Sequence, residues 1–385
     1  MRLEFIPYGQ QTIDDDDISS VIEVLRSPWL TTGPMVEAFE ADFATYVGAS
    51  HAVAVSNGTA ALHLSMLAAG LGPGDEVIVP AITFVASANA ARYVGADVKF
   101  ADVDPETFLI DVESVRSLIT PRTKAIVPVD YGGMPCDYSA LQSLADEHGL
   151  VIIEDACHAP GAEYQGRRVG SISSMTAFSF HPVKHITTGE GGMVTTESAE
   201  LATRLRTFRS HGITSDFRKR EAAGTWEFDQ VDLGYNYRIA DINCALGRSQ
   251  LEKQPTWVAK RREIAAGYTE VLRDVEGLAV QHEPEGRLSA WHLYPVRITG
   301  PEAAEVRREV YTRMRADSIG VNVHYRPVYL NTYYRQLGYS EGLCPVAESV
   351  YAGLLSLPMW PGLDGASQER VVDSLRQALA DLRPV

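Results

Sequence analysis

Residues 178–194 read Phe-Ser-Phe-His-Pro-Val-Lys-His-Ile-Thr-Thr-Gly-Glu-Gly-Gly-Met-Val, and Lys184 lies near the middle of this segment. The residues before it alternate as in a short strand, and the glycines after it allow a sharp turn and a close approach of the backbone to a ligand. A strand that carries the amine into an apolar interior would lower its pKa by desolvation and make it a usable nucleophile. The alternative is an ordinary surface lysine in a turn, since lysine is mostly exposed in proteins.

Length and composition are those of a soluble globular enzyme. The 385 residues can bury a large core and indicate two domains, and 45% hydrophobic with 22% charged residues is ordinary for this class. The net charge of -16 argues against a nucleic-acid-binding surface, which needs clustered positive charge. An anionic substrate would therefore be held by local donors.

The cysteines and the hydropathy pattern indicate which kinds of site and which cellular compartment to expect. The four cysteines are widely spaced, so we expect neither a metal site nor a disulfide framework. Residues 1–6 are not followed by the apolar run of a signal peptide, and no stretch approaches the roughly 18 apolar residues of a membrane span. We therefore predict a cytoplasmic protein that contacts no membrane.

Two segments in the first 64 residues carry possible ligand signals. A predicted helix begins with the acids of residues 14–17, and residues 28–34 break it; this break is either a simple connector or a loop that contacts substrate. A strand at 51–55 is followed by Ser-Asn-Gly-Thr at 56–59 and a helix. Free N–H groups at such a helix N-terminus favour a phosphate, although the same residues also cap helices that bind nothing.

An acid ends the most apolar strand of the chain. Residues 150–153 form a near-continuous apolar run, typical of a central parallel strand, and Glu154 and Asp155 follow it. Ligands bind beyond the carboxyl ends of such strands, and a carboxylate buried there requires a partner. For Asp155 the partner is a helix N-terminus that it caps, a structural salt bridge, or the cation of a bound ring.

Alternating strand and helix patterns predict an α/β fold whose central sheet is mostly parallel, with helices on both faces. We place the domain boundary at Pro255, which separates a large domain (1–254) from a small C-terminal domain (255–385). The predicted strands are 76–79, 97–101, 125–128, 150–153, 192–195, 292–298 and 320–324; the predicted helices are 36–50, 84–93, 112–118, 138–148, 199–210, about 239–250, 257–273, 303–317, 345–355 and 367–382, with a polar excursion over 211–235.

Three features fit one cofactor, pyridoxal 5′-phosphate. They are the phosphate site around Gly58, the acid Asp155 at the end of a strand, and Lys184, which lies 29 positions after this acid (155 to 184). The lysine amine would form a Schiff base with its aldehyde. The acid would keep the pyridine nitrogen protonated, so that the ring accepts the electrons released when a Cα–H bond breaks.

At this point the chain resembles the sugar aminotransferases of the DegT/DnrJ/EryC1/StrS group, which have the type I aminotransferase fold. Within this group it is most similar to the UDP-4-amino-4,6-dideoxy-N-acetyl-β-L-altrosamine transaminases of pseudaminic acid biosynthesis. The resemblance runs over nearly the whole chain, and it implies a smaller C-terminal α+β domain. The segments that carry it are residues 6–9, 179–188, 233–238, 291–295 and 324–327.

The resemblance implies a role for each matching residue around the cofactor ring. Lys184 matches the Schiff-base lysine, and Asp155 matches the acid on the pyridine nitrogen. His158 stands where many relatives have Gln, beside the ring and its 3-hydroxyl, where it hydrogen-bonds, stacks, or is simply a core histidine. Phe84 matches the aromatic residue packed on the ring, with plain core packing as the alternative.

The remaining matches concern the phosphate and the substrate. Gly58, Thr59 and Ser179 match phosphate ligands. Asn236 resembles the residue that reaches the phosphate from the neighbouring subunit, so the resemblance implies a homodimer with shared active sites. The residues that fall where relatives contact the nucleotide sugar are Tyr8, Pro28, Trp29, Leu30, Thr31, His324, Tyr325, Arg326 and Pro327.

By resemblance, the reaction transfers the amino group of L-glutamate to the 4-ketone of a UDP-linked 6-deoxy amino sugar, with Lys184 as general base and acid. Three alternatives are retained. One is an aminotransferase of the same group that acts on another keto sugar, such as a dTDP-sugar, or at C3. The second is a dehydratase of the same fold, against which Lys184 argues because such relatives carry histidine in its place. The third is a non-catalytic sugar- or phosphate-binding protein.

Overall fold

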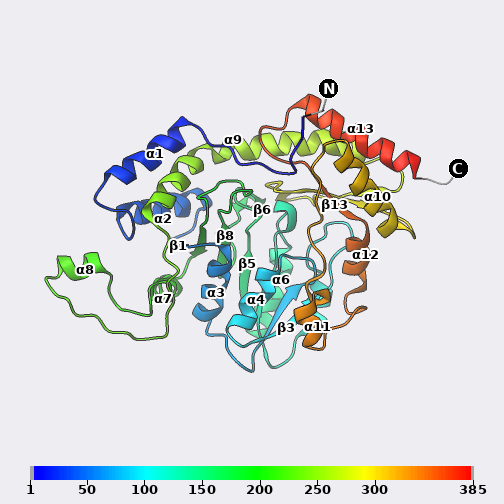
Figure 1. Cartoon of the computed structure of the whole chain (residues 1–385). Coiled ribbons are helices and arrows are strands. Elements are labelled where there is room, and N and C mark those ends of the chain that lie inside the picture. Colours follow the sequence, from blue (N-terminus) through cyan, green and yellow to red (C-terminus); the bar gives the residue numbers. More distant parts are fainter. Residues whose placement is uncertain (1–3, 383–385) are drawn as a thin grey trace.

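The computed structural model describes residues 4–382, with the exception of the side chain of Lys219, and its centre is a seven-stranded sheet (Figure 1). The strand order is β1-β9-β8-β5-β4-β2-β3. The strands from β3 through β2, β4 and β5 to β8 are parallel, and β9 pairs antiparallel with β8 and β1. The bounds are β1 His51–Val55, β2 Glu76–Pro80, β3 Asp97–Ala101, β4 Thr123–Ile126, β5 Val151–Asp155, β8 Met175–Ser179 and β9 Gly192–Thr196.

Helices cover both faces of this sheet, as the alternating pattern predicts (Figure 1). Strands β2 and β8 are buried along their whole length, as expected of strands covered on both faces. α3 packs beside α4 and α7, and α5 packs beside α6. These helices are α3 Gly58–Ala68, α4 Val85–Tyr93, α5 Val112–Leu118, α6 Tyr138–His148 and α7 Ala199–Arg209.

The C-terminal part contains a separate three-stranded antiparallel sheet of order β10-β12-β13. A third small sheet joins β6 and β7 to β11, so that residues of both halves of the chain pair with one another. The division into domains at residue 255 stays a prediction. The bounds are β6 Glu163–Tyr164, β7 Arg167–Arg168, β10 Leu278–Val280, β11 Arg287–Leu288, β12 Tyr294–Ile298, β13 Leu354–Leu357, α10 Ala303–Ala316, α11 Thr332–Gln336, α12 Pro345–Gly353 and α13 Gly365–Asp381.

The predicted helix break at Pro255 is wrong. A single helix, α9 (Asp241–Leu272), runs through this proline (Figure 1). An interior proline costs roughly 3 kcal/mol because it removes a hydrogen bond and crowds the preceding turn. The helix persists because its neighbours on both sides of the proline are buried, with Gln254 at 0% and Val258 at 4% exposure, and because α9 packs against α1 (Asp15–Arg26) and α2 (Pro34–Val47).

The predicted strand over 320–324 is also wrong. Isolated bridges take the place of a strand: Asn322 pairs with Ser356, and Ile319, just before the segment, pairs with Ile6. The N-terminal segment occupies one side, where the Gly320 N–H donates to the Ile6 carbonyl at 2.6 Å, while β13 takes the other. Because consecutive residues pair with different partners, no continuous ladder forms.

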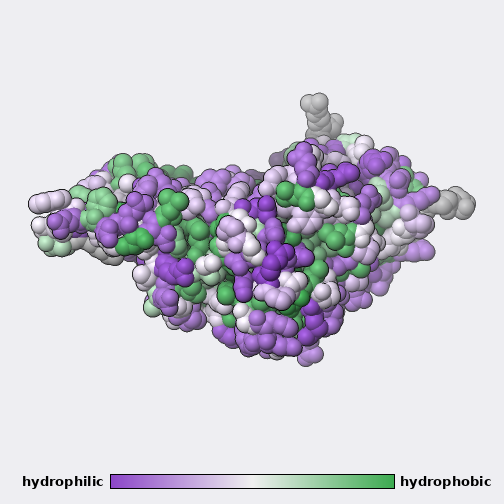
Figure 2. Space-filling model, turned by 90° about the horizontal axis from the view of Figure 1, so that it is seen from below, coloured by the Kyte–Doolittle hydropathy of each residue, from purple (hydrophilic) through white to green (hydrophobic). Residues whose placement is uncertain are grey.

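The excursion over 211–235 is present as predicted and contains one short helix, α8 (Phe217–Ala222). It extends away from the body of the molecule, and the space-filling view shows it again as an arm at the left (Figures 1 and 2). Several large apolar side chains of this arm are exposed, among them Trp226 at 83% and Leu233 at 74%. No helix within residues 4–382 has the length and apolar character needed to cross a membrane.

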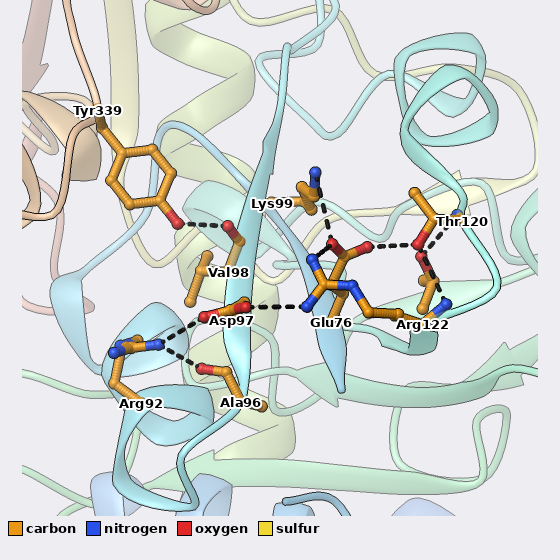
Figure 3. Close-up of polar contacts among 10 residues, drawn as sticks. Glu76, Arg92, Ala96, Asp97, Val98, Lys99, Thr120, Arg122 and Tyr339 are labelled. Carbon is orange, nitrogen blue, oxygen red and sulfur yellow. Dashed lines mark hydrogen bonds and ion pairs between the residues drawn. The ribbon is translucent and has the colours of Figure 1, made fainter. Parts of the chain in front are cut away.

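A charged network fixes the amino ends of β2, β3 and β4 (Figure 3). Glu76, at the start of β2, is 1% exposed; it pairs with Arg122 and with Lys99, and accepts a hydrogen bond from the Thr120 hydroxyl at 2.6 Å. Asp97, at the start of β3, also pairs with Arg122 at 3.1 Å. The buried carboxylate of Glu76 is thus fully compensated, at the end of the sheet opposite to the strand ends that carry Asp155 and Ser179.

Candidate active site

A cavity of about 890 Å³ lies beyond the carboxyl ends of β5 and β8. This is the edge at which parallel sheets of α/β proteins bind ligands. The starts of α3 and α4, the turn after β8 and the segment after residue 320 complete its wall. Of the residues predicted from the sequence, it brings together Tyr8, Gly58, Thr59, Phe84, Asp155, His158, Ser179, Lys184, His324 and Tyr325.

Lys184 is partly buried and lines this cavity. The strand before it is anchored by Phe178 and Phe180, whose rings pack 5.0 and 5.4 Å from that of Phe43. The turn after it requires glycine at 191, because a Cβ there would lie 2.1 Å from the Thr188 hydroxyl oxygen. Burial lowers the pKa of the Lys184 amine, while Cys157 and Asp155 act in the opposite direction. The lysine is therefore not an ordinary surface residue.

Asp155 is the last residue of β5 and is 5% exposed. Its Oδ2 accepts a hydrogen bond from the Ser87 hydroxyl at 2.6 Å, and its Oδ1 accepts one from the Cys157 N–H at 3.2 Å. Within the described part of the chain it forms no salt bridge, so that alternative is not realised. A nearly buried carboxylate that faces a cavity with only neutral donors is suited to a cation in that cavity.

The start of α3 forms an anion cradle. Asn57 caps the helix by accepting from the Ala60 N–H at 2.8 Å, and the N–H groups of Gly58 and Thr59 have no hydrogen-bond partner in residues 4–382. A Cβ at Gly58 would lie 2.8 Å from the Cβ of Ser179, so only glycine lets the helix end approach this closely. Free N–H groups at a helix N-terminus beside a hydroxyl are suited to a phosphate.

His158 is buried among rings. The Gly132 N–H points at its Nδ1 at 3.4 Å, which makes Nδ1 the acceptor and places the proton on Nε2, 3.3 Å from the Tyr325 hydroxyl. Its ring lies 4.4 Å from that of His292. Burial, together with the positive charge of Lys184, holds the pKa of His158 well below its usual value, so the ring is neutral. His158 thus both hydrogen-bonds and packs against rings of the protein.

Phe84 is not a core residue. Its ring is 55% exposed, lines the cavity and lies 5.8 Å from the ring of Tyr325. An apolar ring that is left open beside a cavity is suited to pack on the flat face of a ligand. The same cavity also contains Tyr8, whose ring lies 5.6 Å from that of His324.

Other residues predicted from the resemblance do not line this cavity. Arg326 is exposed and Pro327 is buried outside it. Asn236 is exposed, and its backbone is bridged to Ser210. Pro28, Trp29, Leu30 and Thr31 also lie outside it, and Thr31 is bridged to Ala240.

A second cavity, of about 520 Å³, contains Thr31 and adjoins the Asn236 turn. Glu40 pairs with Arg206 and Arg209, and Glu37 pairs with Arg218. Arg238, two residues after Asn236, has no hydrogen-bond or ion-pair partner within the described residues. The cavity is lined by five arginines, Arg206, Arg209, Arg218, Arg220 and Arg238, whereas none lines the cavity of Lys184.

Several residues in or next to the Lys184 cavity were not found from the sequence. Ser87 lies in α4 and touches Asp155, but a serine in a predicted helix carries no signal of its own. His292 and Asn322 lie within the predicted strands 292–298 and 320–324, and only the tertiary structure brings them to the cavity. The nearest signal was the Trp-His-Leu-Tyr-Pro run at 291–295.

The residues present fit pyridoxal 5′-phosphate. The cavity offers an amine for its aldehyde, a carboxylate for its pyridine nitrogen, a cradle for its phosphate and an open aromatic ring. Gly58 supports the fit, since its lack of a side chain keeps the cradle open beside Ser179. Within residues 4–382 no cluster of His, Cys, Asp and Glu could hold a metal ion.

Comparison with known proteins agrees with this fit. The model of the DegT/DnrJ/EryC1/StrS aminotransferase family matches residues 11–376. The chain belongs to this family. The fold prediction is thereby confirmed, and the family supports the predicted cofactor.

Three relatives illustrate the likeness. The spore coat polysaccharide biosynthesis protein SpsC of Bacillus subtilis is 40% identical over 97% of both chains. The putative sugar aminotransferase Spr1654 of Streptococcus pneumoniae, solved in a PMP-form, is 31% identical with a TM-score of 0.94, over 98% of this chain and 100% of that one. PseC of Helicobacter pylori, an aminotransferase of pseudoaminic acid biosynthesis, is 32% identical with a TM-score of 0.92 over the same shares.

Proposed function

We propose that the protein is a pyridoxal 5′-phosphate-dependent aminotransferase that moves the amino group of L-glutamate to C4 of a UDP-linked 4-keto-6-deoxy-N-acetylamino sugar. The product would be UDP-4-amino-4,6-dideoxy-N-acetyl-β-L-altrosamine. One observation carries the proposal: Lys184 and Asp155 line one cavity together with the Gly58–Thr59 cradle and Ser179.

When bound, pyridoxal phosphate supplies an electron sink for a carbanion at the substrate's amino-bearing carbon. Lys184 would hold its aldehyde, and the amine, once free, would carry a proton to and from this carbon through Nζ. The lowered pKa of the amine favours the neutral form that accepts the proton. Asp155 would hold the ring nitrogen in its cationic form, with the Ser87 hydroxyl fixing the carboxylate. Gly58, Thr59 and Ser179 would bind the phosphate.

The likeness to the H. pylori protein supports the altrosamine-type product. The higher identity to a protein of spore coat polysaccharide biosynthesis favours a second candidate, the same amino transfer to another nucleotide keto sugar. A dTDP-linked sugar, or transfer at C3, falls in this class.

We further propose a homodimer in which each active site is shared. In a single chain, the residues that the resemblance assigns to one site are divided: Tyr8 and Tyr325 line one cavity, Thr31 lines the second, and Asn236 lines neither. Glutamate and a nucleotide diphosphate both carry negative charge, yet arginine lines only the second cavity. A two-fold dimer that places the second cavity of one subunit against the first cavity of its partner would complete the site.

Product analysis tests the proposal. The purified protein is incubated with L-glutamate and a panel of UDP- and dTDP-linked keto sugars, and the aminated carbon and its configuration are determined. Amination at C4 of the UDP sugar alone is the expected result. Preference for another sugar would make that sugar the substrate in place of the proposed one. A colourless protein that cannot be reconstituted with pyridoxal phosphate would favour a non-catalytic binding protein.

A further inference from the structure

Behind the cofactor site lies a pair of buried acids, Asp130 and Glu154. Asp130 follows β4, and Glu154 precedes Asp155 on β5, so its side chain points to the opposite face of the sheet. Both are 0% exposed. The backbone joins them, because the Asp130 N–H donates to the Asp155 carbonyl at 3.1 Å. Besides burial, the charge of Glu154 also raises the pKa of Asp130, so the two carboxyl groups are neighbours.

The donors around this pair do not suffice for two carboxylates. Asp130 Oδ1 accepts from the Tyr138 hydroxyl at 2.6 Å and from the Cys136 N–H at 2.9 Å. Glu154 Oε2 accepts from the Thr176 hydroxyl at 2.8 Å. Asp130 Oδ2 and Glu154 Oε1 have no hydrogen-bond partner among the described residues, and the neutral Ser173 hydroxyl near Glu154 is also buried without one. Two neighbouring carboxylates that are both ionised and both leave an oxygen unpartnered are not tolerated in a buried site.

The surrounding charges do not compensate a second negative charge. Within the described residues, neither acid pairs with Lys, Arg or His. The titratable groups that face the pair are Tyr138 and Cys136, and burial raises the pKa of both well above its usual value, so both are neutral. The cation that acts on Cys136, Arg287, pairs with Asp137 at 3.2 Å. Burial and the neighbouring Glu154 also raise the pKa of Asp130 well above its usual value.

Glu76 shows the contrasting arrangement in the same sheet. It is equally buried, but Arg122 and Lys99 meet its charge (Figure 3). Cations therefore meet the charge of Glu76, whereas no cation among the described residues meets the charge of the pair behind the cofactor site.

We propose that Asp130 and Glu154 share one proton at neutral pH, and that this protonated pair is a positioning element of the cofactor site. The proton lies on Asp130 Oδ2 and is donated to Glu154 Oε1, which leaves Asp130 Oδ1 free to accept its two other hydrogen bonds. The pair then carries one negative charge, and every one of its oxygens has a partner.

The positioning role follows from what the turn after Asp130 contacts. The Gly132 N–H points at Nδ1 of His158, and a Cβ at Gly133 would lie 2.9 Å from the His158 carbonyl oxygen. Loss of the shared proton would drive Asp130 away from β5. The turn would move with it, and His158 would lose the contact that sets its tautomer.

Proton release on unfolding tests the shared proton. The holoprotein is unfolded by denaturant in weakly buffered solution at pH 7.5, and the protons released are titrated. In the unfolded chain both acids regain ordinary pKa values and ionise. Wild-type protein should therefore release about one proton per chain more than Asp130→Asn, which keeps every hydrogen bond of the pair with an amide in place of the acid. Glu154→Gln serves as the second variant if Asp130→Asn does not fold.

Glu76→Gln is the matched control, because it neutralises a buried glutamate of the same sheet that shares no proton. It should release as many protons as the wild type. Equal release by wild type, Asp130→Asn and Glu154→Gln would overturn the shared proton. An infrared band of a protonated carboxylic acid at neutral pH, present in wild type and absent in Asp130→Asn, is the expected independent result.

The positioning role has its own readout, the dissociation constant of pyridoxal phosphate as a function of pH. In wild type the affinity should fall at alkaline pH, where the shared proton is lost. Asp130→Asn has no such proton and should lack this alkaline loss. Identical pH profiles of the two proteins would overturn the positioning role. Neither measurement uses a sugar substrate, so a wrong substrate assignment leaves both unaffected.

Discussion

The Ser87 hydroxyl donates a hydrogen bond of 2.6 Å to Oδ2 of Asp155, and this contact joins α4 to the end of β5. The serine is itself fully buried, and its oxygen lies 2.7 Å from that of Thr83. The strand therefore fixes the backbone of Asp155, and the helix fixes the rotation of its carboxylate. A ligand cation in the cavity would meet a carboxylate whose direction is already set.

Removing this contact should weaken cofactor binding without unfolding the protein. A hydrogen bond to a charged group contributes about 1.5–3 kcal/mol, so Ser87→Ala should raise the dissociation constant of pyridoxal phosphate about tenfold or more. The measurement is a spectroscopic titration of the cofactor-free protein. Ser143→Ala removes an exposed serine whose hydroxyl bonds only to the Ser139 carbonyl, and it should change nothing. Equal affinities for both variants would contradict the role of Ser87.

Replacing Lys184 should abolish amino transfer. Lys184→Ala removes the only amine in the described lining of the cavity, and turnover should fall about a thousandfold or more. Borohydride should no longer fix the cofactor to the chain. Lys124→Ala, at an exposed position of β4, is the control and should retain full activity. Substantial turnover by Lys184→Ala would contradict the role of Lys184 as the lysine that holds the cofactor and transfers the proton.

The shared active site can be tested by complementation. Asn236→Ala should weaken cofactor retention, because this side chain would reach the phosphate of the partner subunit. When Lys184→Ala and Asn236→Ala chains are co-expressed, half of the dimers are hybrids, and each hybrid has one intact site. Activity should then return to roughly a quarter of the wild-type rate. If both residues served the same chain's site, mixing would restore nothing.

Acid should destabilise the protein through its buried histidines. Burial holds the pKa of His158, His185 and His292 well below the unfolded value near 6.5, so the unfolded chain binds more protons as pH falls. Their contribution to stability is complete above about pH 6.5 and is lost below it, at up to about 1.4 kcal/mol per pH unit for each ring. Urea unfolding at pH 5 to 7 measures this slope.

His185→Gln isolates one of these rings. The amide can still donate to the Ala290 carbonyl, which the ring nitrogen Nε2 meets at 2.9 Å. Below pH 6.5, the change of the unfolding free energy with pH should correspond to one bound proton fewer than in the wild type. His148→Gln, at an exposed position, should leave this pH dependence unchanged. The idea fails if the two variants show the same slope as the wild type.

The sequence predicted those features that depend on local pattern. The strand ends at Asp155 and Ser179, the glycine at 58 and the turn around Lys184 are all local, and the structure places them in one cavity. The break at Pro255 was wrong because packing of the flanking turns outweighs the preference of one residue. The pairing of Asp130 with Glu154 was out of reach, since nothing in either segment indicates that the two acids face each other. The division of Tyr8 and Thr31 between two cavities is likewise a property of the tertiary fold alone.

The unbroken course of α9 has a mechanical consequence. One end of this rod is fixed to α1 and α2, and the other end contacts β10 and α13 of the C-terminal part. Because α9 is one continuous helix, no flexible loop interrupts it between these two sets of contacts. The C-terminal sheet can therefore move relative to α1 and α2 only if α9 itself bends. The weakest point is Pro255, which offers no N–H to the carbonyl one turn earlier. If that sheet moves during turnover, deuterium uptake should change first in the amides that flank this proline.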